Sequence, residues 1–157
     1  MQKQIIKQAV VSAARSDVYD AFTTTDGATT FFGPRANVEK RLLGAYEILF
    51  DLEEEPGRQG GEDCRMLAFL ELELLSFEWN APPQFPNARN EKTFVVVRFH
   101  EAPGGTRVEL VHAGFGEGEE WDAVHAYFER AWGLVMHWLV HRFSVGPIDW
   151  DSPPRPA

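Results

Sequence analysis

The sequence predicts an α+β protein in which a curved antiparallel sheet wraps around a long C-terminal helix. Three observations favour this class. A strand-like run near the N-terminus is followed at once by two short helical segments, strand-like alternation dominates the middle, and one long amphipathic segment comes last. We expect about six to seven strands in the sheet, formed mainly by hairpins.

The N-terminal part predicts one strand and two short helices. Residues 4–11 are rich in β-branched side chains, which favours a strand. Ser16 is a suitable N-cap for a first helix with an apolar face, and Thr25 or Asp26 can begin a second helix that runs through Phe32. Gly33 and Pro34 then end that helix.

The middle of the chain predicts three hairpins. Their strands are residues 36–42 with 45–51, 63–71 with 74–80, and 92–100 with 106–113. Residues 52–61 form a turn region rich in glycine, and residues 81–91 form a long loop with three prolines. Because side chains alternate along a strand, one face of the last hairpin points inward. That face carries Val95, Val97, Phe99, Val108, Leu110 and His112.

The segment from Glu119 to Phe143 predicts a helix of about seven turns. Glu117, Glu119 and Glu120 lie at its start, where the helix dipole favours acidic residues. One apolar face runs along the whole helix and faces the sheet. It consists of Trp121, Val124, Phe128, Trp132, Val135, Leu139 and Phe143.

Length and composition indicate one domain, residues 1–146, followed by a proline-rich tail, residues 147–157, which cannot continue a helix or strand. The net charge of −9 argues against nucleic acid and membrane surfaces as partners. A single cysteine, Cys64, excludes an internal disulfide. Without a signal-peptide pattern or a membrane span, we expect a cytoplasmic protein.

Four segments share a pattern with a known superfamily. Ala13–Thr23 matches the opening A-x-x-x-x-V-W-x-A-x-T, with Tyr19 in place of the Trp, and Leu75–Trp79 matches L-x-F-x-W. Gly105–Phe115 matches G-T-x-V-x-L-x-H-x-G-F, and Trp132 opens a W-x-x-x-L-x-x-L stretch, although Ala131 replaces the usual Gly before it.

The chain therefore resembles START-like (SRPBCC) helix-grip domains, and within them the family related to the activator of heat-shock protein 90 ATPase. The resemblance covers residues 4–143. It implies a helix-grip fold with a pocket between the sheet and the final helix. Members of this branch often pair, so the resemblance also implies a homodimer. The relation to the heat-shock protein 90 activator implies a chaperone as a further candidate partner.

Aromatic residues make up 13% of the chain, enough to line such a pocket. The expected wall consists of apolar residues around one polar anchor, the inward-facing His112. The predicted ligand-binding residues are Phe31, Phe32, Trp79, His112, Phe115, Phe128, Trp132, Val135 and Met136. A fully packed core without a cavity is the alternative interpretation of the same residues.

No catalytic, cofactor or metal site is predicted. His137 and His141 have the four-residue spacing of helical metal ligands, but the residues between them lack the Glu of a zinc-protease motif. Neither Ser12 nor Ser144 has the surroundings of a nucleophile.

The leading functional hypothesis is a non-enzymatic protein that binds an apolar, aromatic or lipid-like small molecule. The alternative is a module that contacts a chaperone or another protein, steered by the acidic loops at residues 51–55 and 117–120. A second alternative, suggested by related folds, is a cyclase- or hydrolase-like enzyme that uses His112.

Overall fold

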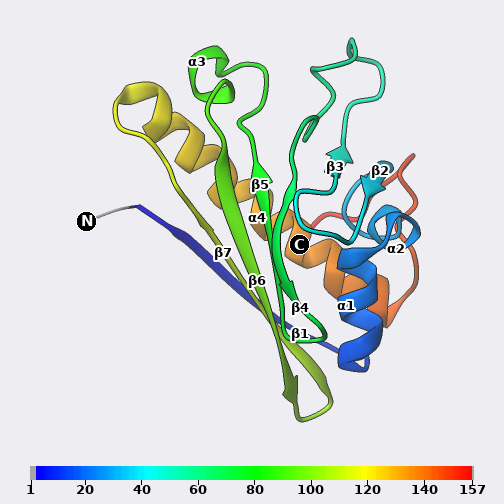
Figure 1. Ribbon diagram of the computed structural model, residues 1–157. Helices are drawn as coiled ribbons and strands as arrows, with labels where there is room; N and C mark the ends of the chain where they lie inside the picture. The colour runs from blue at the N-terminus through cyan, green and yellow to red at the C-terminus, as the bar shows by residue number, and fades with distance from the viewer. Residues whose placement is uncertain (1–2, 157) are drawn as a thin grey trace.

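The computed structural model describes residues 3–156, so residues 1, 2 and 157 at the ends of the predicted domain and tail lie outside the description. Its architecture is the predicted α+β class, with strands in the middle of the chain and a long last helix (Figure 1). The strands are β1 (Ile5–Val11), β2 (Arg35–Val38), β3 (Tyr46–Leu49), β4 (Met66–Leu70), β5 (Leu74–Trp79), β6 (Thr93–Ala102) and β7 (Gly105–Ala113). The helices are α1 (Arg15–Thr23), α2 (Thr25–Thr29), α3 (Pro86–Arg89) and α4 (Glu119–Ser144).

The strands are divided between two antiparallel sheets. The larger sheet has five strands in the order β1-β7-β6-β5-β4, and β2 and β3 pair with each other in a sheet of two strands. An isolated bridge between Ala45 and Arg65 links the two sheets beside β3 and β4. Helix α4 runs along one face of the larger sheet, and α1 and α2 lie near the C-terminal half of α4 (Figure 1).

The predicted inward face of the last hairpin is confirmed. Val95 pairs with His112, Val97 with Leu110 and Phe99 with Val108 across β6 and β7, and all six side chains are buried. The apolar face of α4 is also confirmed, because Val124, Phe128, Trp132, Val135 and Leu139 are buried. Together these residues form the core between helix and sheet.

The first predicted hairpin is shorter in the structure because the chain turns away after β2. Leu43 adopts a positive φ of 61°, and the Glu39 carboxylate accepts a hydrogen bond from the Ala45 amide at 3.2 Å. Gly44 is required in this turn, since a Cβ there would lie 2.5 Å from the Glu39 carbonyl oxygen. The Glu39 amide also donates to the Ala45 carbonyl at 2.8 Å, so one backbone contact of the hairpin extends past β2 before the turn begins.

Both short helices form, with shifted boundaries. The N-cap of α1 is Ala14 rather than the predicted Ser16, because the Ala14 carbonyl already accepts hydrogen bonds from the Asp17 and Val18 amides. Helix α2 is capped by the Thr24 side chain, which accepts from the Gly27 amide at 3.0 Å. It ends at Thr29, and the two phenylalanines that follow enter the core.

The tail after α4 has no helix or strand in residues 147–156, yet it packs against the domain. Ile148 is buried, and its amide donates to the Thr30 carbonyl at 2.9 Å. The Trp150 indole donates to the Thr29 carbonyl at 2.7 Å and meets Trp138 edge-on at 5.1 Å. These contacts tie the tail to the end of α2 and to α4.

Deleting residues 147–157 is expected to lower the free energy of unfolding by about 2–4 kcal/mol, because burial of Ile148 and Trp150 is lost. Chemical denaturation of the two chains measures the difference. A shorter deletion of residues 152–157 keeps both side chains and should cost about 1 kcal/mol or less. Equal effects of the two deletions would contradict this account.

Candidate functional site

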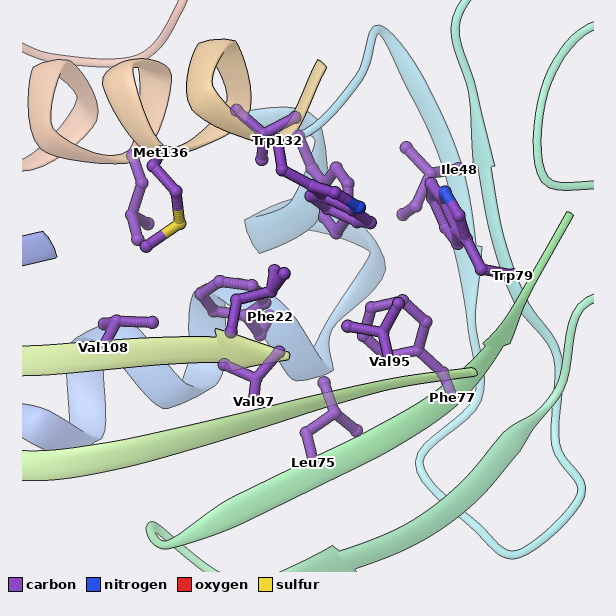
Figure 2. Close-up of a cluster of buried hydrophobic side chains, with 14 of the residues drawn as sticks. Phe22, Ile48, Leu75, Phe77, Trp79, Val95, Val97, Val108, Trp132 and Met136 are labelled. Atoms are coloured by element: carbon purple, nitrogen blue, oxygen red, sulfur yellow. The ribbon is translucent and has the colours of Figure 1, made fainter. Parts of the chain in front are cut away.

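The space between the middle of α4 and the sheet is filled by side chains. Trp132 and Met136 project from α4 toward the sheet residues Val95, Val97 and Val108 (Figure 2). Phe32 lies at the centre of this cluster, stacked on Trp79 at 5.5 Å and edge-on to Trp132 at 5.9 Å. This part of the predicted pocket is therefore a packed aromatic core.

His112 is part of that core and forms a polar chain across it. The Trp132 indole nitrogen donates to His112 Nδ1 at 2.9 Å, and His112 Nε2 lies 2.7 Å from Thr93 Oγ1. The Thr93 hydroxyl donates onward to the Trp79 carbonyl at 3.1 Å. Because Nδ1 must accept from the indole, the proton is on Nε2 and is donated to Thr93. Both ring nitrogens are thus engaged.

Burial also keeps this ring neutral. His112 is fully buried, and the removal of solvent lowers the pKa of its imidazole to about 3, with a smaller contribution from His125. A neutral, fully hydrogen-bonded ring joins β7 to α4, which is a structural role.

Replacing His112 by Gln is expected to flatten the dependence of stability on pH. The unfolded histidine binds a proton near pH 6.5 and the folded one only near pH 3, so the unfolded state holds more protons between these values. Wild-type stability should therefore fall as the pH drops below 6.5, by up to about 1.4 kcal/mol per pH unit from this group alone. Urea unfolding of both proteins between pH 7 and 4 measures the slopes, and parallel slopes would contradict the assignment.

A groove of about 480 Å³ opens beside the core, between α4, residues 50–60 and residues 80–84. One wall is apolar and comes from β5 and α4: Trp79, Tyr127, Phe128, Trp132, Val135 and Trp138. The other wall is polar and comes from the two loops and from α3: Asp51, Glu54, Arg58, Asn80, Gln84 and Arg89. Asp51, Glu54, Arg58 and Gln84 are exposed, so the groove is open to solvent on the loop side.

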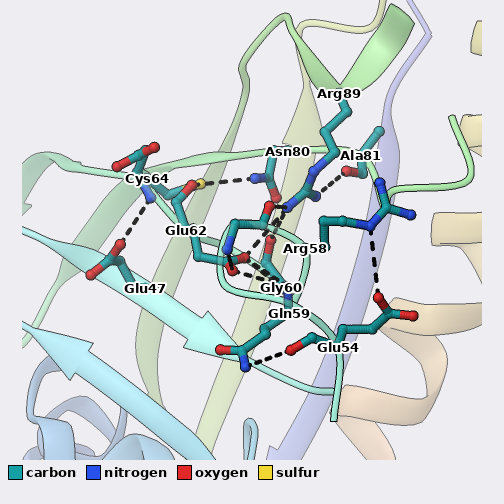
Figure 3. Close-up of polar contacts among 12 residues, drawn as sticks. Glu47, Glu54, Arg58, Gln59, Gly60, Glu62, Cys64, Asn80, Ala81 and Arg89 are labelled. Atoms are coloured by element: carbon teal, nitrogen blue, oxygen red, sulfur yellow. Dashed lines mark hydrogen bonds and ion pairs between the residues drawn. The ribbon is translucent and has the colours of Figure 1, made fainter. Parts of the chain in front are cut away.

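The polar wall is held in place by Glu62 (Figure 3). Its carboxylate accepts hydrogen bonds from the backbone amides of Gly57, Gln59 and Gly60 at 2.6 to 3.1 Å. Partial burial acts to raise the pKa of Glu62, but the backbone donors outweigh it and the pKa is lowered. The carboxylate is thus stabilised in its charged form and shapes the loop around it.

Arg89 joins this loop to α3. Its guanidinium donates to the carbonyl oxygens of Ala81 at 2.6 Å, Gly57 at 2.7 Å and Gly60 at 3.1 Å, and it lies 3.4 Å from Glu62 Oε1. Arg89 is on the single-turn helix that forms inside the predicted loop 81–91. The groove wall is therefore ordered by contacts between segments about thirty residues apart.

The structure divides the predicted ligand-binding residues between two places. Four of them line the groove: Trp79, Phe128, Trp132 and Val135. Phe31, Phe32, His112 and Met136 are buried in the core and are not part of the groove wall. Phe115, in the segment between β7 and α4, also belongs to the core, and its ring centroid lies 4.5 Å from that of His112 and 5.3 Å from that of His125.

The polar wall of the groove is absent from the sequence-based list of site residues. Asn80 and Arg58 belong to loops, and Arg89 to the single-turn α3, and the strand and helix patterns do not define the position of any of them. The length of the proline-containing loop 81–91 and the acidic run at residues 51–55 are the sequence signals in this region.

The matching family is described as Activator of Hsp90 ATPase homolog 1-like protein, and its model covers residues 12–144. The fold is that of the helix-grip, START-like proteins, and the chain belongs to this Hsp90 ATPase activator-like family. The comparison with curated proteins gives no match.

Solved structures share the fold at low sequence identity. Protein MLL2253 from Mesorhizobium loti has a TM-score of 0.71 and 16% identity, over 88% of this chain and 95% of the other. The Aha1 dimer from Colwellia psychrerythraea has a TM-score of 0.67 and 16% identity, over 92% and 98%. CalU16 from Micromonospora echinospora has a TM-score of 0.68 and 18% identity, over 93% and 77%.

Within the described residues 3–156, no group of three or more His, Cys, Asp or Glu side chains is arranged to hold a metal ion. None of the helices in this part of the chain is long and apolar enough to cross a membrane.

Proposed function

We propose that the protein binds an apolar, aromatic small molecule in the groove between α4 and the loops at residues 50–60 and 80–84. The observation that carries the proposal is the aromatic wall of this groove, which is open to solvent on its loop side. Its volume of about 480 Å³ lies within the range of small-molecule sites in proteins, roughly 300–1,000 Å³.

The chemistry of the wall supports a flat, apolar ligand. Trp79, Phe128 and Trp132 pack with one another at centroid distances of 5.3 Å and 6.4 Å and are at most 5% exposed. The partly exposed rings of Tyr127 and Trp138 therefore offer the aromatic surface of the groove to a ligand. A further ring placed against them gains apolar contact at about 25 cal/mol per Å² of buried area, before the costs of binding. Trp138 extends this surface along α4.

Native mass spectrometry of protein purified from its source tests the proposal. We expect an added mass that is released on denaturation and is identified as an aromatic or lipid-like compound. Addition of that compound to the stripped protein should raise the thermal unfolding temperature. A clean apo mass, with no thermal shift against a panel of lipids and aromatic metabolites, would contradict the proposal.

A second candidate function rests on the exposed loop beside the groove. Phe50 is 40% exposed and Leu52 is 38% exposed, among the acidic residues Asp51 and Glu53 to Glu55. We propose as the alternative that this loop contacts a partner protein, and the family description points to an Hsp90-type chaperone. Leu52 does not line the groove, so Leu52→Ser separates the two functions.

The alternative is tested with a purified Hsp90-type chaperone. Wild-type protein should raise the rate of ATP hydrolysis, and Leu52→Ser should lower the stimulation by about tenfold if the side chain anchors the contact. An unchanged hydrolysis rate on addition of wild-type protein would rule this function out.

A further inference from the structure

Asn80 lies where the apolar and polar walls of the groove meet. It follows directly after β5, lines the groove, and is only 7% exposed. Its side-chain nitrogen donates to the Glu62 carbonyl oxygen at 3.4 Å (Figure 3). A carbonyl oxygen can only accept, so this contact places the amide nitrogen on the Glu62 side.

The other half of the amide is unused. Among residues 3–156, no donor is hydrogen-bonded to Asn80 Oδ1. This oxygen is not one of the buried side-chain atoms that lack a partner, so it is open to solvent, and because Asn80 lines the groove it is available to a ligand. Asn80 is the most buried of the polar side chains in the groove wall.

The cations of the groove wall are already paired. The Arg89 guanidinium is engaged with three carbonyl oxygens and Glu62, as described above. Arg58 lies 3.7 Å from the Glu54 carboxylate, and Asp51 adds a further negative charge to the wall. A carboxylate or phosphate on the ligand would therefore face acidic side chains without an unpaired cation in the described lining.

We propose that the groove selects neutral aromatic molecules that carry a hydrogen-bond donor, such as a phenol hydroxyl or a ring N–H, and that Asn80 Oδ1 accepts this donor. The proposal rests on the proposed ligand-binding function and defines its ligand class. The aromatic wall binds the ring, and Asn80 orients it by one hydrogen bond. An analogue that lacks the donor displaces water from Asn80 Oδ1 without replacing its hydrogen bond, so it should bind more weakly.

Three naphthalenes of similar size test the proposal at pH 7: 2-naphthol, 2-methoxynaphthalene and 2-naphthoate. The first has a neutral donor, the second has none, and the third is an anion. Titration followed by tryptophan fluorescence should give 2-naphthol an affinity about tenfold higher than that of 2-methoxynaphthalene. 2-Naphthoate should bind most weakly.

Asn80→Leu removes the acceptor and keeps a side chain of similar size. It should bring the affinities for 2-naphthol and 2-methoxynaphthalene to within about twofold of each other. The Glu62 carbonyl keeps a donor in this variant, because Lys92 Nζ lies 3.3 Å from it. Asn37→Leu, which removes an exposed amide on β2 that does not line the groove, is the matched control and should keep the tenfold ratio. Asn80→Ser, with a shorter acceptor, provides a second variant if Asn80→Leu fails to fold.

The outcomes separate this inference from the function on which it rests. If none of the three compounds binds, the ligand-binding proposal itself is overturned, and the role of Asn80 with it. If 2-naphthol and 2-methoxynaphthalene bind equally to the wild type, or if Asn80→Leu and Asn80→Ser both keep the tenfold ratio, binding stands and the role of Asn80 is overturned. Tightest binding of 2-naphthoate would overturn the requirement for a neutral ligand.

Discussion

Trp132→Ala is expected to lower the free energy of unfolding by about 3–5 kcal/mol, the range for removing a large aromatic side chain from a core. Trp132 is 1% exposed and packs against Phe32, Trp79 and Phe128. Its indole nitrogen is the donor to His112 Nδ1, so the substitution also leaves a buried acceptor without a partner. Urea denaturation followed by circular dichroism measures the loss.

Two further variants identify the cause of that loss. Trp132→Phe keeps most of the apolar contact but removes the indole donor, and should cost about 1–3 kcal/mol for the unpaired His112 nitrogen. Trp138→Ala removes a tryptophan that is only partly buried, and should cost less than Trp132→Ala. A larger effect of Trp138→Ala would show that the helix is not anchored through Trp132.

Ala131→Trp is expected to weaken ligand binding by about 100-fold while the protein stays folded. Ala131 lines the groove from α4 and is partly exposed, so a large side chain there extends into the ligand space rather than into the core. Binding is lost because the space is occupied, which is a steric effect and leaves the Asn80 amide intact. Titration with 2-naphthol measures the affinity.

Ala126→Trp is the matched control for this substitution. Ala126 is exposed on the same helix and does not line the groove, so the same residue placed there should leave the affinity within about twofold. Thermal unfolding of both variants checks that the fold is retained. Full affinity in Ala131→Trp would mean that the ligand binds elsewhere on the molecule.

The inward face of β6 and β7 shows how far local pattern determines this fold. Because side chains alternate along a strand, Val95, Val97 and Phe99 could be placed in the core from their spacing, and His112 with them. The same is true of α4, whose buried residues recur with the period of a helix. The order of elements and the family motifs then led to the helix-grip fold.

The role of His112 required the tertiary structure. The alternation of side chains along β7 predicted that the His112 ring points inward. Both a ligand anchor and a core residue are compatible with that position. Contacts with Trp132 on α4 and Thr93 on β6 occupy both nitrogens, and neither partner is near His112 in the sequence. Hydrogen bonds between distant segments depend on side-chain geometry that periodicity does not contain.

The groove also combines residues that local sequence pattern predicts with residues that only tertiary contacts place. Strand alternation and helical periodicity predict the class of fold and the faces that form the core, because these follow from repeats within single elements. Four of the residues on those faces also line the groove. Where the core is filled and where it opens depends on tertiary contacts. Glu62 and Arg89 bring two loops together opposite α4, and that contact between irregular segments creates the polar wall with Asn80. Loop positions are set by such individual hydrogen bonds and not by a repeating pattern, which is the physical reason that the sequence alone could not reveal them.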